Sequence, residues 1–344
     1  MTTAAAEAVG EFLVDLAERL RIGCDPASIR AMVKRVRGGQ LDARRADVHR
    51  ASVLTSSCVP LEASVSGGRG QFTPVIRYVT ATAVPETEFG SRVAAQLAAI
   101  RDLVAWLPYG DQAVADLLLS FVTTLYPDTM KTPMWRHRSP LWIGVVHHAA
   151  APHDVARLKV YGGPSTGPGG LYQLCRALPG FAGLASVPDH EKLITPVGAA
   201  IEVDAHGEVN HKIYLKARYN DVGVPMKMIR HFGDPAWQVL SELVRCGVDA
   251  AELHRHSFFV CCARGRGAPD FSLHLVARRR DDFTGLAYEL ASRHHGTPHG
   301  VEALALAAGS AGATLRYSAV GLGFSADYGI DKLNVYGIPT WSTA

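Results

Sequence analysis

Between residues 157 and 161 the sequence reads Arg157-Leu158-Lys159-Val160-Tyr161, in which cationic or phenolic side chains alternate with apolar ones. Successive side chains of a β-strand point to opposite faces of the sheet. The pattern therefore predicts a strand with a polar face, formed by Arg157, Lys159 and Tyr161. Leu158 and Val160 would form its apolar face.

The same alternation returns in residues 212–218 and 332–336. The side chains that would share the polar faces of these two strands are Lys212, Tyr214, Lys216 and Arg218, and Lys332, Asn334 and Tyr336. One such strand alone is most often a surface strand whose charged face lies in water. Three strands that each pair a cation with a tyrosine favour polar faces that converge inside a closed sheet. A cationic, phenol-lined chamber of this kind predicts a diphosphate site.

The composition indicates a globular protein and excludes two kinds of partner. The 344 residues allow one large domain or two ordinary ones, and 48% are hydrophobic and 19% charged. The net charge of +3 is too small, and Lys and Arg too dispersed, to predict binding to nucleic acid. No apolar run reaches the roughly 18 residues of a membrane span. Six cysteines without CxxC spacing, and no predicted signal sequence, favour a cytoplasmic location.

Hydrophobic periodicity predicts five pairs of strands separated by helices. The predicted strands are residues 60–66 and 74–82, 141–149 and 156–162, 198–204 and 210–219, 256–263 and 271–278, and 313–326 and 332–338. The predicted helices are residues 3–21, 26–37, 90–107, 111–125, 170–178, 224–232, 235–247, 282–295 and 299–308. Short gaps within the pairs indicate antiparallel hairpins, because a parallel pair needs a long crossover.

Ten strands in hairpin pairs most economically form one α/β (α+β) domain: a ten-stranded antiparallel β-barrel with an enclosed chamber, ringed by α-helices. The helices would cover the outward Leu, Val and Ile, and polar side chains would point inward. We predict a single domain over residues 1–344, with an N-terminal helical segment, residues 1–50, packed on the barrel. A parallel (β/α) barrel is the alternative, which the hairpin-length gaps disfavour.

The order of these elements, together with two further motifs, resembles a known family. The motifs are Pro60-Leu61-Glu62-Ala63-Ser64 and Ile76-Arg77-Tyr78-Val79. They resemble the ABBA-fold (PT-barrel) aromatic prenyltransferases, and in particular the dimethylallyltryptophan synthase branch, over about residues 50–340. The resemblance implies transfer of an allyl group from an isoprenoid diphosphate, most simply dimethylallyl diphosphate, to an indole or tryptophan-type small molecule. It also implies secondary (alkaloid) metabolism, no metal or other cofactor, and a monomer or homodimer.

The resemblance also implies roles for individual residues. Glu62 would accept the indole N–H. The implied diphosphate clamp is Arg77, Lys159, Lys212 and Lys332, with Arg157 and Lys216 as further cations. The implied shield around the allyl cation is Tyr161, Tyr214 and Tyr336, and His274 stands where the family has a tyrosine. These residue types suit the chemistry, because cations stabilise the departing diphosphate and aromatic faces stabilise an allyl cation.

Besides His274, two positions depart from the family pattern. Asn210 stands where family members often have Arg, and Lys216 or Arg218 would have to supply the missing charge. Tryptophan-directed enzymes commonly carry a Lys on the strand before Lys159, able to take the ring proton. Here that strand ends in His147-His148, so His147 or His148 is the candidate base, with an ordinary imidazole pKa of about 6.5. Water and diphosphate are the alternatives.

The sequence leaves other functions open. The acceptor could instead be a phenol or an aromatic residue of a peptide, and the barrel could be a non-catalytic carrier of an anionic isoprenoid. No metal site is predicted. Asp281-Asp282 does not continue into a DDxxD motif, and the pairs His147-His148 and His294-His295 lack acidic or Cys neighbours.

Overall fold

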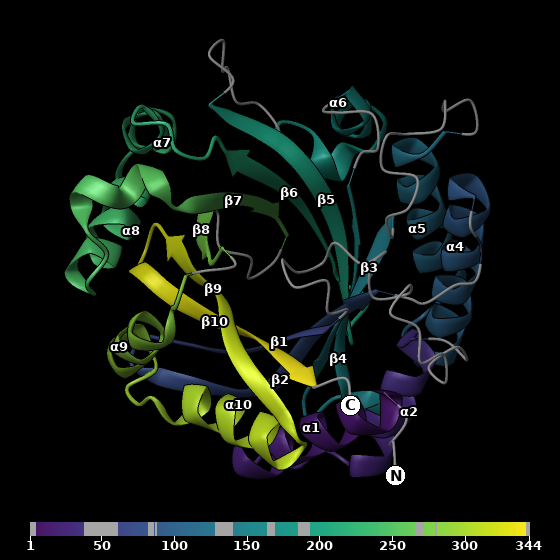
Figure 1. The fold of residues 1–344 in the computed structure, drawn as a ribbon. Coiled ribbons are helices and arrows are strands. Elements are labelled where there is room, and N and C mark those ends of the chain that lie inside the picture. The colour runs from purple at the N-terminus through teal and green to yellow at the C-terminus, as the bar shows by residue number, and fades with distance from the viewer. Residues whose placement is uncertain are drawn as a thin grey trace.

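The computed structural model describes residues 5–37, 61–81, 86, 88–127, 140–163, 169–184, 193–265, 271–278 and 281–341. Ten strands close into one antiparallel barrel in the order β1-β10-β9-β8-β7-β6-β5-β4-β3-β2 (Figure 1). Each strand pairs with its neighbours in the sequence, and β1 closes the ring against β10. The predicted ten-stranded antiparallel barrel is confirmed, and the parallel alternative is wrong.

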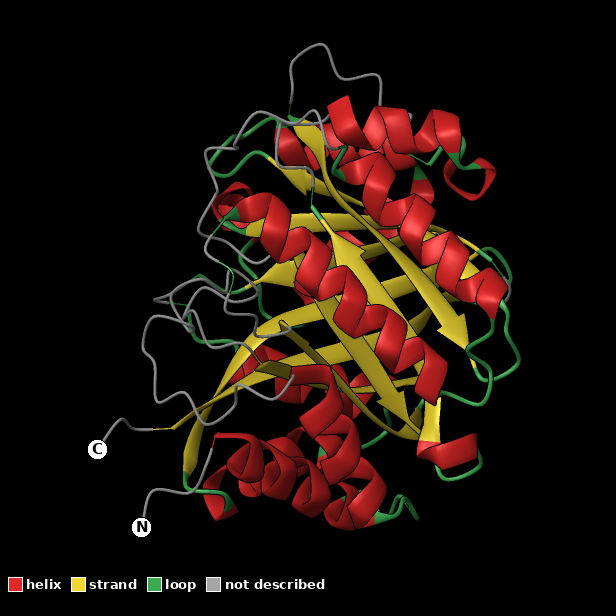
Figure 2. Ribbon diagram, turned by 90° about the vertical axis from the view of Figure 1, so that its right-hand side faces the viewer, coloured by secondary structure: helices red, strands yellow, loops and turns green. Residues whose placement is uncertain are grey.

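The elements follow the predicted order of hairpins and helices. The strands are β1 (Leu61–Gly68), β2 (Gln71–Ala81), β3 (Leu141–His147), β4 (Val155–Gly162), β5 (Ile194–Asp204), β6 (Val209–Ala217), β7 (Ser257–Arg264), β8 (Phe271–Val276), β9 (Ala313–Ser325) and β10 (Gly329–Trp341). The helices are α1 (Ala5–Arg19), α2 (Pro26–Arg37), α4 (Phe89–Trp106), α5 (Gln112–Leu125), α6 (Gly169–Ala177), α7 (Val224–Phe232), α8 (Asp234–Arg245), α9 (Thr284–His294) and α10 (His299–Ser310). They lie outside the ring of strands (Figures 1 and 2).

Alternation along the strands separates an outer apolar face from an inner polar one. In β4, Leu158 and Val160 are buried in the core under the helical layer, where α5 packs on β4 and β5. Lys159, on the opposite face, has Gly144 of β3 and Glu202 of β5 as its cross-strand partners. The polar faces therefore line the inside of the barrel, as the alternation predicts.

The strand connections give the lumen two distinct ends. Consecutive strands alternate in direction, so the strand ends that each hairpin joins lie at one end of the barrel, and the strand ends between which the helices stand in the sequence lie at the other. Glu62 lies near the start of β1, at the end with the helical connections. Lys332 lies near the β9–β10 turn and Arg157 near the β3–β4 turn. Glu62 thus lies toward one end of the lumen, and Lys332 and Arg157 lie toward the other.

The N-terminal helices pack on the outside of the barrel. Helices α1 and α2 contact each other and β2, and they also contact α10 and α4 respectively (Figure 1). Of the predicted N-terminal segment, residues 5–37 are described, so its boundary at residue 50 lies outside the described part of the chain. None of the helices in the described residues is long and apolar enough to cross a lipid bilayer.

Three strands extend by three or more residues beyond one of their predicted ends. β2 begins at Gln71, β5 begins at Ile194, and β10 continues to Trp341. Proline has no N–H to donate to a strand ladder, so it reads as a break in a strand pattern. In β5 the register shifts between Pro196 and Gly198, and this bulge allows the strand to continue through the proline.

Candidate active site

Two of the predicted clamp lysines meet inside the barrel. Lys159 extends from β4 and Lys212 from β6, on either side of β5. Lys212 Nζ lies 2.9 Å from Glu202 Oε2, and Lys159 Nζ lies 4.0 Å from the same atom. Lys159 Nζ also donates a hydrogen bond of 2.7 Å to Tyr214 Oη. The structure therefore brings Lys159, Lys212 and Tyr214 together as predicted.

The other predicted clamp residues lie around this pair. Arg77 Nη1 donates to Asn334 Oδ1 at 2.5 Å, which connects β2 to β10 across the lumen side of β1. Burial, followed by the nearby charge of Arg77, lowers the pKa of Lys332 to about 7. Arg157 Nη1 lies 3.5 Å from Glu202 Oε1. Lys216 Nζ lies 5.6 Å from the ring centroid of Phe259, and Lys216 is exposed, whereas Lys159 and Lys212 are partly buried.

The predicted shield residues form two aromatic pairs. The rings of Tyr161 and Tyr214 lie 6.0 Å apart, and Lys159 Nζ is 4.4 Å from the Tyr161 centroid. The rings of Tyr336 and His274 lie 5.9 Å apart. Burial and the neighbouring Lys159 lower the pKa of His274 to about 3, so this imidazole is neutral at ordinary pH. The lumen therefore offers neutral ring faces next to its cations.

Glu62 extends from β1 near the end of the lumen at which the helices connect the hairpins. Its Oε1 accepts a hydrogen bond of 2.5 Å from Ser318 Oγ of β9. Burial raises the pKa of Glu62 to about 7, although the Ser318 hydroxyl and the charge of Arg316 act in the opposite direction. Near neutral pH this carboxyl is thus poised between a hydrogen-bond donor and an anionic acceptor.

His147 is not placed with the other candidates, and its prediction as a luminal base needs correction. It is fully buried on the outer face of β3, where its ring stacks on Tyr78 with centroids 5.8 Å apart. Burial lowers its pKa to about 4. The luminal residues of β3 include Gly144, against which the Tyr161 ring packs so closely that a Cβ would come within 3.1 Å of it. His148 follows β3, in the turn, where its Nδ1 accepts from a backbone N–H.

Replacing His147 by Leu is expected to leave unchanged any activity that the luminal residues carry, and to stabilise the protein in acid. Its folded pKa of about 4 lies below the unfolded value, so the unfolded chain binds the proton first and stability falls as the pH drops below about 6.5. The Leu variant lacks this loss. Its free energy of unfolding relative to that of wild type should therefore be about 2 kcal/mol higher at pH 5 than at pH 8. Chemical denaturation at both pH values measures this difference. The outward placement would be contradicted if variant and wild type differed in free energy of unfolding by the same amount at both pH values, or if the variant lost turnover.

The structure adds Glu202 and Ser318 to the candidate site. Ala200, Glu202 and Asp204 are two residues apart, so the sequence predicts that they share one face of β5. Its contact with two lysines depends on the register of β4, β5 and β6, which local pattern does not define. Ser318 reaches Glu62 beside a register shift between Tyr336 and Gly337 of β10, and no sequence signal indicates that shift.

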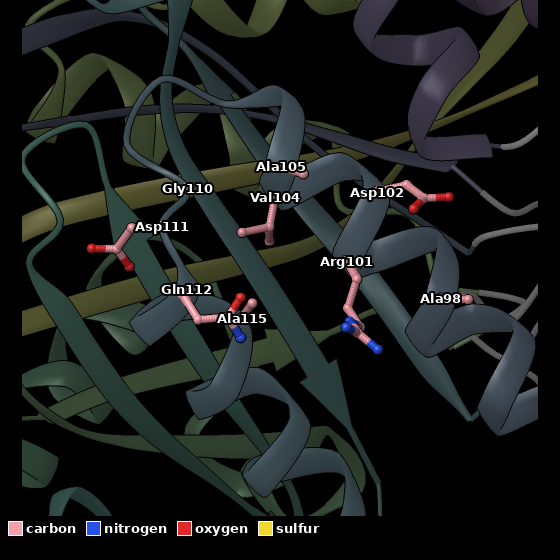
Figure 3. Close-up of a pocket in the computed structure, with 9 residues that line it drawn as sticks. All are labelled: Ala98, Arg101, Asp102, Val104, Ala105, Gly110, Asp111, Gln112 and Ala115. Carbon is pink, nitrogen blue, oxygen red and sulfur yellow. The ribbon is translucent and has the colours of Figure 1, made fainter.

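Two surface pockets lie at different distances from the luminal residues. A cavity of about 320 Å³ lies between α4 and α5, outside the barrel, and is lined by Arg101, Asp102 and Gln112 among others (Figure 3). None of the predicted site residues lines it. A second pocket, of about 550 Å³, lies between the β1–β2 and β9–β10 turns and includes Lys332 and Ser66. The lumen's cationic level therefore borders a pocket at the hairpin end.

In the described residues, His, Cys, Asp and Glu side chains do not gather in threes or more as metal ligands. The two histidines of the pair at 294 and 295 have different partners. His294 Nε2 lies 3.0 Å from Glu242 Oε1, and His295 Nε2 lies 3.2 Å from the Leu333 carbonyl.

Comparisons with known proteins identify the fold. No protein-family model and no curated protein matches the chain. The 5-dimethylallyltryptophan synthase from Streptomyces coelicolor has a TM-score of 0.74 and 16% identity, over 98% of this chain and 97% of its own. The 6-dimethylallyltryptophan synthase from Micromonospora olivasterospora, in complex with DMASPP and Trp, has a TM-score of 0.69 and 16% identity, over 97% of each chain. AnaPT from Neosartorya fischeri has a TM-score of 0.61 and 13% identity, over 98% and 95%. This chain therefore has the ABBA (PT-barrel) fold of the aromatic prenyltransferases, as its sequence resemblance predicted.

Proposed function

We propose that the protein is an aromatic prenyltransferase that transfers the dimethylallyl group of dimethylallyl diphosphate to an indole or tryptophan-type acceptor. The observation that carries this proposal is the pair of ammonium groups from Lys159 and Lys212, held inside a closed barrel beside the rings of Tyr161 and Tyr214. The similarity to a structure in complex with DMASPP and Trp supports the choice of donor and acceptor.

The luminal residues would act on the two charges that separate during ionisation. When the allylic C–O bond breaks, its electron pair leaves with diphosphate, and Lys159, Lys212 and Arg77 would stabilise the anion. The allyl cation would remain against the faces of Tyr161 and Tyr214. Cation–π attraction contributes about 2 kcal/mol at a desolvated ring. The same rings would exclude water, which otherwise captures the cation.

The acceptor would be held at the other level of the lumen. The Glu62 carboxylate would accept the indole N–H, which orients the ring and raises its electron density for attack. A ring carbon then bonds to the allyl carbon, and the ring proton must leave to restore aromaticity. With His147 on the outer face of β3, we assign this proton to the departing diphosphate or to water.

A product screen tests the proposal. Purified protein would be incubated with donors of five, ten and fifteen carbons and with tryptophan, simple indoles, phenols and aromatic peptides, each with and without EDTA. Mass spectrometry and diphosphate release would be followed. We expect prenylated tryptophan or indole from the five-carbon donor, unaffected by EDTA. Donor binding without turnover on any acceptor would instead identify a carrier, and activity abolished by EDTA would overturn the metal-free mechanism.

A further inference from the structure

A buried carboxylate lies among the cations of the proposed diphosphate site. The Glu202 side chain is 4% exposed, and its Oε2 lies 2.9 Å from Lys212 Nζ and 4.0 Å from Lys159 Nζ. Its Oε1 lies 3.5 Å from Arg157 Nη1 and 3.5 Å from Asn210 Nδ2. An anion at this position repels diphosphate, so its presence in an anion site needs a physical reason.

The reason lies in the charge state of Lys159 and Lys212 before a ligand binds. Burial lowers the pKa of Lys159 and of Lys212, and the two charges further disfavour one another at Lys212. The negative charge of Glu202 raises the pKa of both lysines and so opposes these two effects. Burial also disfavours the Glu202 carboxylate, yet Lys212 and Lys159 hold its pKa well below its usual range. The three groups therefore depend on one another for their charge.

We propose that Glu202 is a positioning residue of the diphosphate site, whose carboxylate keeps the Lys159 and Lys212 ammonium groups charged and directed into the lumen while the site is empty. The proposal rests on the proposed function, because it takes diphosphate as the ligand of these lysines. Each ammonium has three N–H donors. Lys212 donates one to Glu202 and Lys159 donates one to Tyr214, so further donors are left for a bound diphosphate.

Other groups around the lysines do not take over this role. The further titratable or charged groups that face the lysine pair in the described residues are Arg77 on β2, Arg157 and Tyr161 on β4, Tyr214 on β6, Cys261 on β7, His274 on β8 and Lys332 on β10. None of these side chains is a carboxylate, and three are cationic residue types that add to the repulsion. Cys261 acts on both lysines in the same direction as Glu202, but the effect of Glu202 is the larger one, and Glu202 is the group that accepts a hydrogen bond from Lys212.

The test is the affinity for inorganic diphosphate of the wild type, Glu202→Gln and Glu202→Asp, measured by titration calorimetry from pH 6 to pH 9. At pH 6 we expect Glu202→Gln to bind at least as tightly as wild type, because its lysines are charged and a repelling anion is gone. As the pH rises it should lose affinity relative to wild type, about tenfold per pH unit for each lysine that must regain a proton. Glu202→Asp should restore the wild-type profile. His274, with a pKa of about 3, stays neutral over this range. Glu202 also raises the pKa of Lys332, so Lys332 adds to the loss of affinity in Glu202→Gln in the same direction as Lys159 and Lys212.

The opposite result is well defined. If Glu202 only repels diphosphate, Glu202→Gln binds more tightly at every pH and the ratio to wild type is constant, which overturns the proposal. If Glu202→Gln does not fold, NMR of lysines labelled with ¹³C at Cε in the empty wild type decides. Lys212 already deprotonated at pH 7 would overturn the proposal, and Lys212 charged at pH 8 would support it.

Glu242→Gln is the matched control. Glu242 is also a buried carboxylate, with Arg245 and Arg293 as cationic partners and His294 as a third contact, but it lies on α8 outside the barrel. Its variant should lose thermal stability without changing the pH profile of diphosphate binding. A wild type that does not bind diphosphate at any pH would overturn the proposed function itself. If wild type binds diphosphate and the affinity of Glu202→Gln relative to wild type does not change with pH, only the role of Glu202 is overturned.

Discussion

Lys212→Met and Lys159→Met are each expected to lower kcat/KM for dimethylallyl diphosphate about a thousandfold. One unit charge at 4 Å from another contributes about 4 kcal/mol at an effective dielectric of 20, and each 1.4 kcal/mol corresponds to about a factor of ten in rate. Met keeps much of the length of the lysine stem, so the variants remove charge with little change in packing. The loss should fall mainly on kcat, because the charge on diphosphate grows as the C–O bond breaks.

Steady-state kinetics with varied donor at saturating acceptor measures this loss. Lys34→Met, an exposed position on the outer helix α2, is the control for removal of a single positive charge and should behave as wild type. Thermal unfolding of each variant separates lost chemistry from lost folding, because Lys212→Met also removes the nearest partner of buried Glu202. Turnover like that of wild type in both luminal variants would end the assignment of these lysines to the diphosphate.

Glu62→Gln is expected to lower kcat/KM for the aromatic acceptor about a hundredfold and to leave donor affinity unchanged. A hydrogen bond to a charged group contributes up to about 3 kcal/mol, and Gln offers only a neutral acceptor. Glu62 lies at the end of the lumen opposite Lys332, so the donor site should not respond. Acceptor and donor titrations of the variant measure the two effects separately. If donor affinity fell by the same factor as kcat/KM for the acceptor, the assignment of donor and acceptor to opposite ends of the lumen would be contradicted.

The pH dependence provides a second measurement for Glu62. Its pKa of about 7 means that the carboxylate fraction grows through neutrality, so acceptor kcat/KM should rise about tenfold from pH 6 to pH 8. With saturating donor, Lys332 in its proposed role would be paired with diphosphate, which would favour its charged form throughout this range. The rise should be absent in Glu62→Gln. An unchanged rise in the variant would assign the titration to another group.

Much of the site was readable from local pattern. A period of two placed Lys159 and Tyr161 on one strand face, and Lys212 and Tyr214 on another, and short gaps indicated hairpins. The same parity places His147 with Ile143 and Val145, the apolar side chains of β3. Strand parity therefore indicates that His147 faces outward. The prediction of a luminal base came instead from the resemblance to enzymes that carry a base on this strand.

Strand alternation and hairpin-length gaps, read from the sequence by itself, determined the antiparallel barrel and which lysines and tyrosines face its lumen. Only the tertiary structure decided that Glu202 lies between Lys159 and Lys212, and that Ser318 reaches Glu62 from the far end of the chain. The physical reason is that alternation is a property of neighbouring residues in one strand. Which charges meet across strands depends instead on register and bulges, and these are set by long-range packing of the whole barrel.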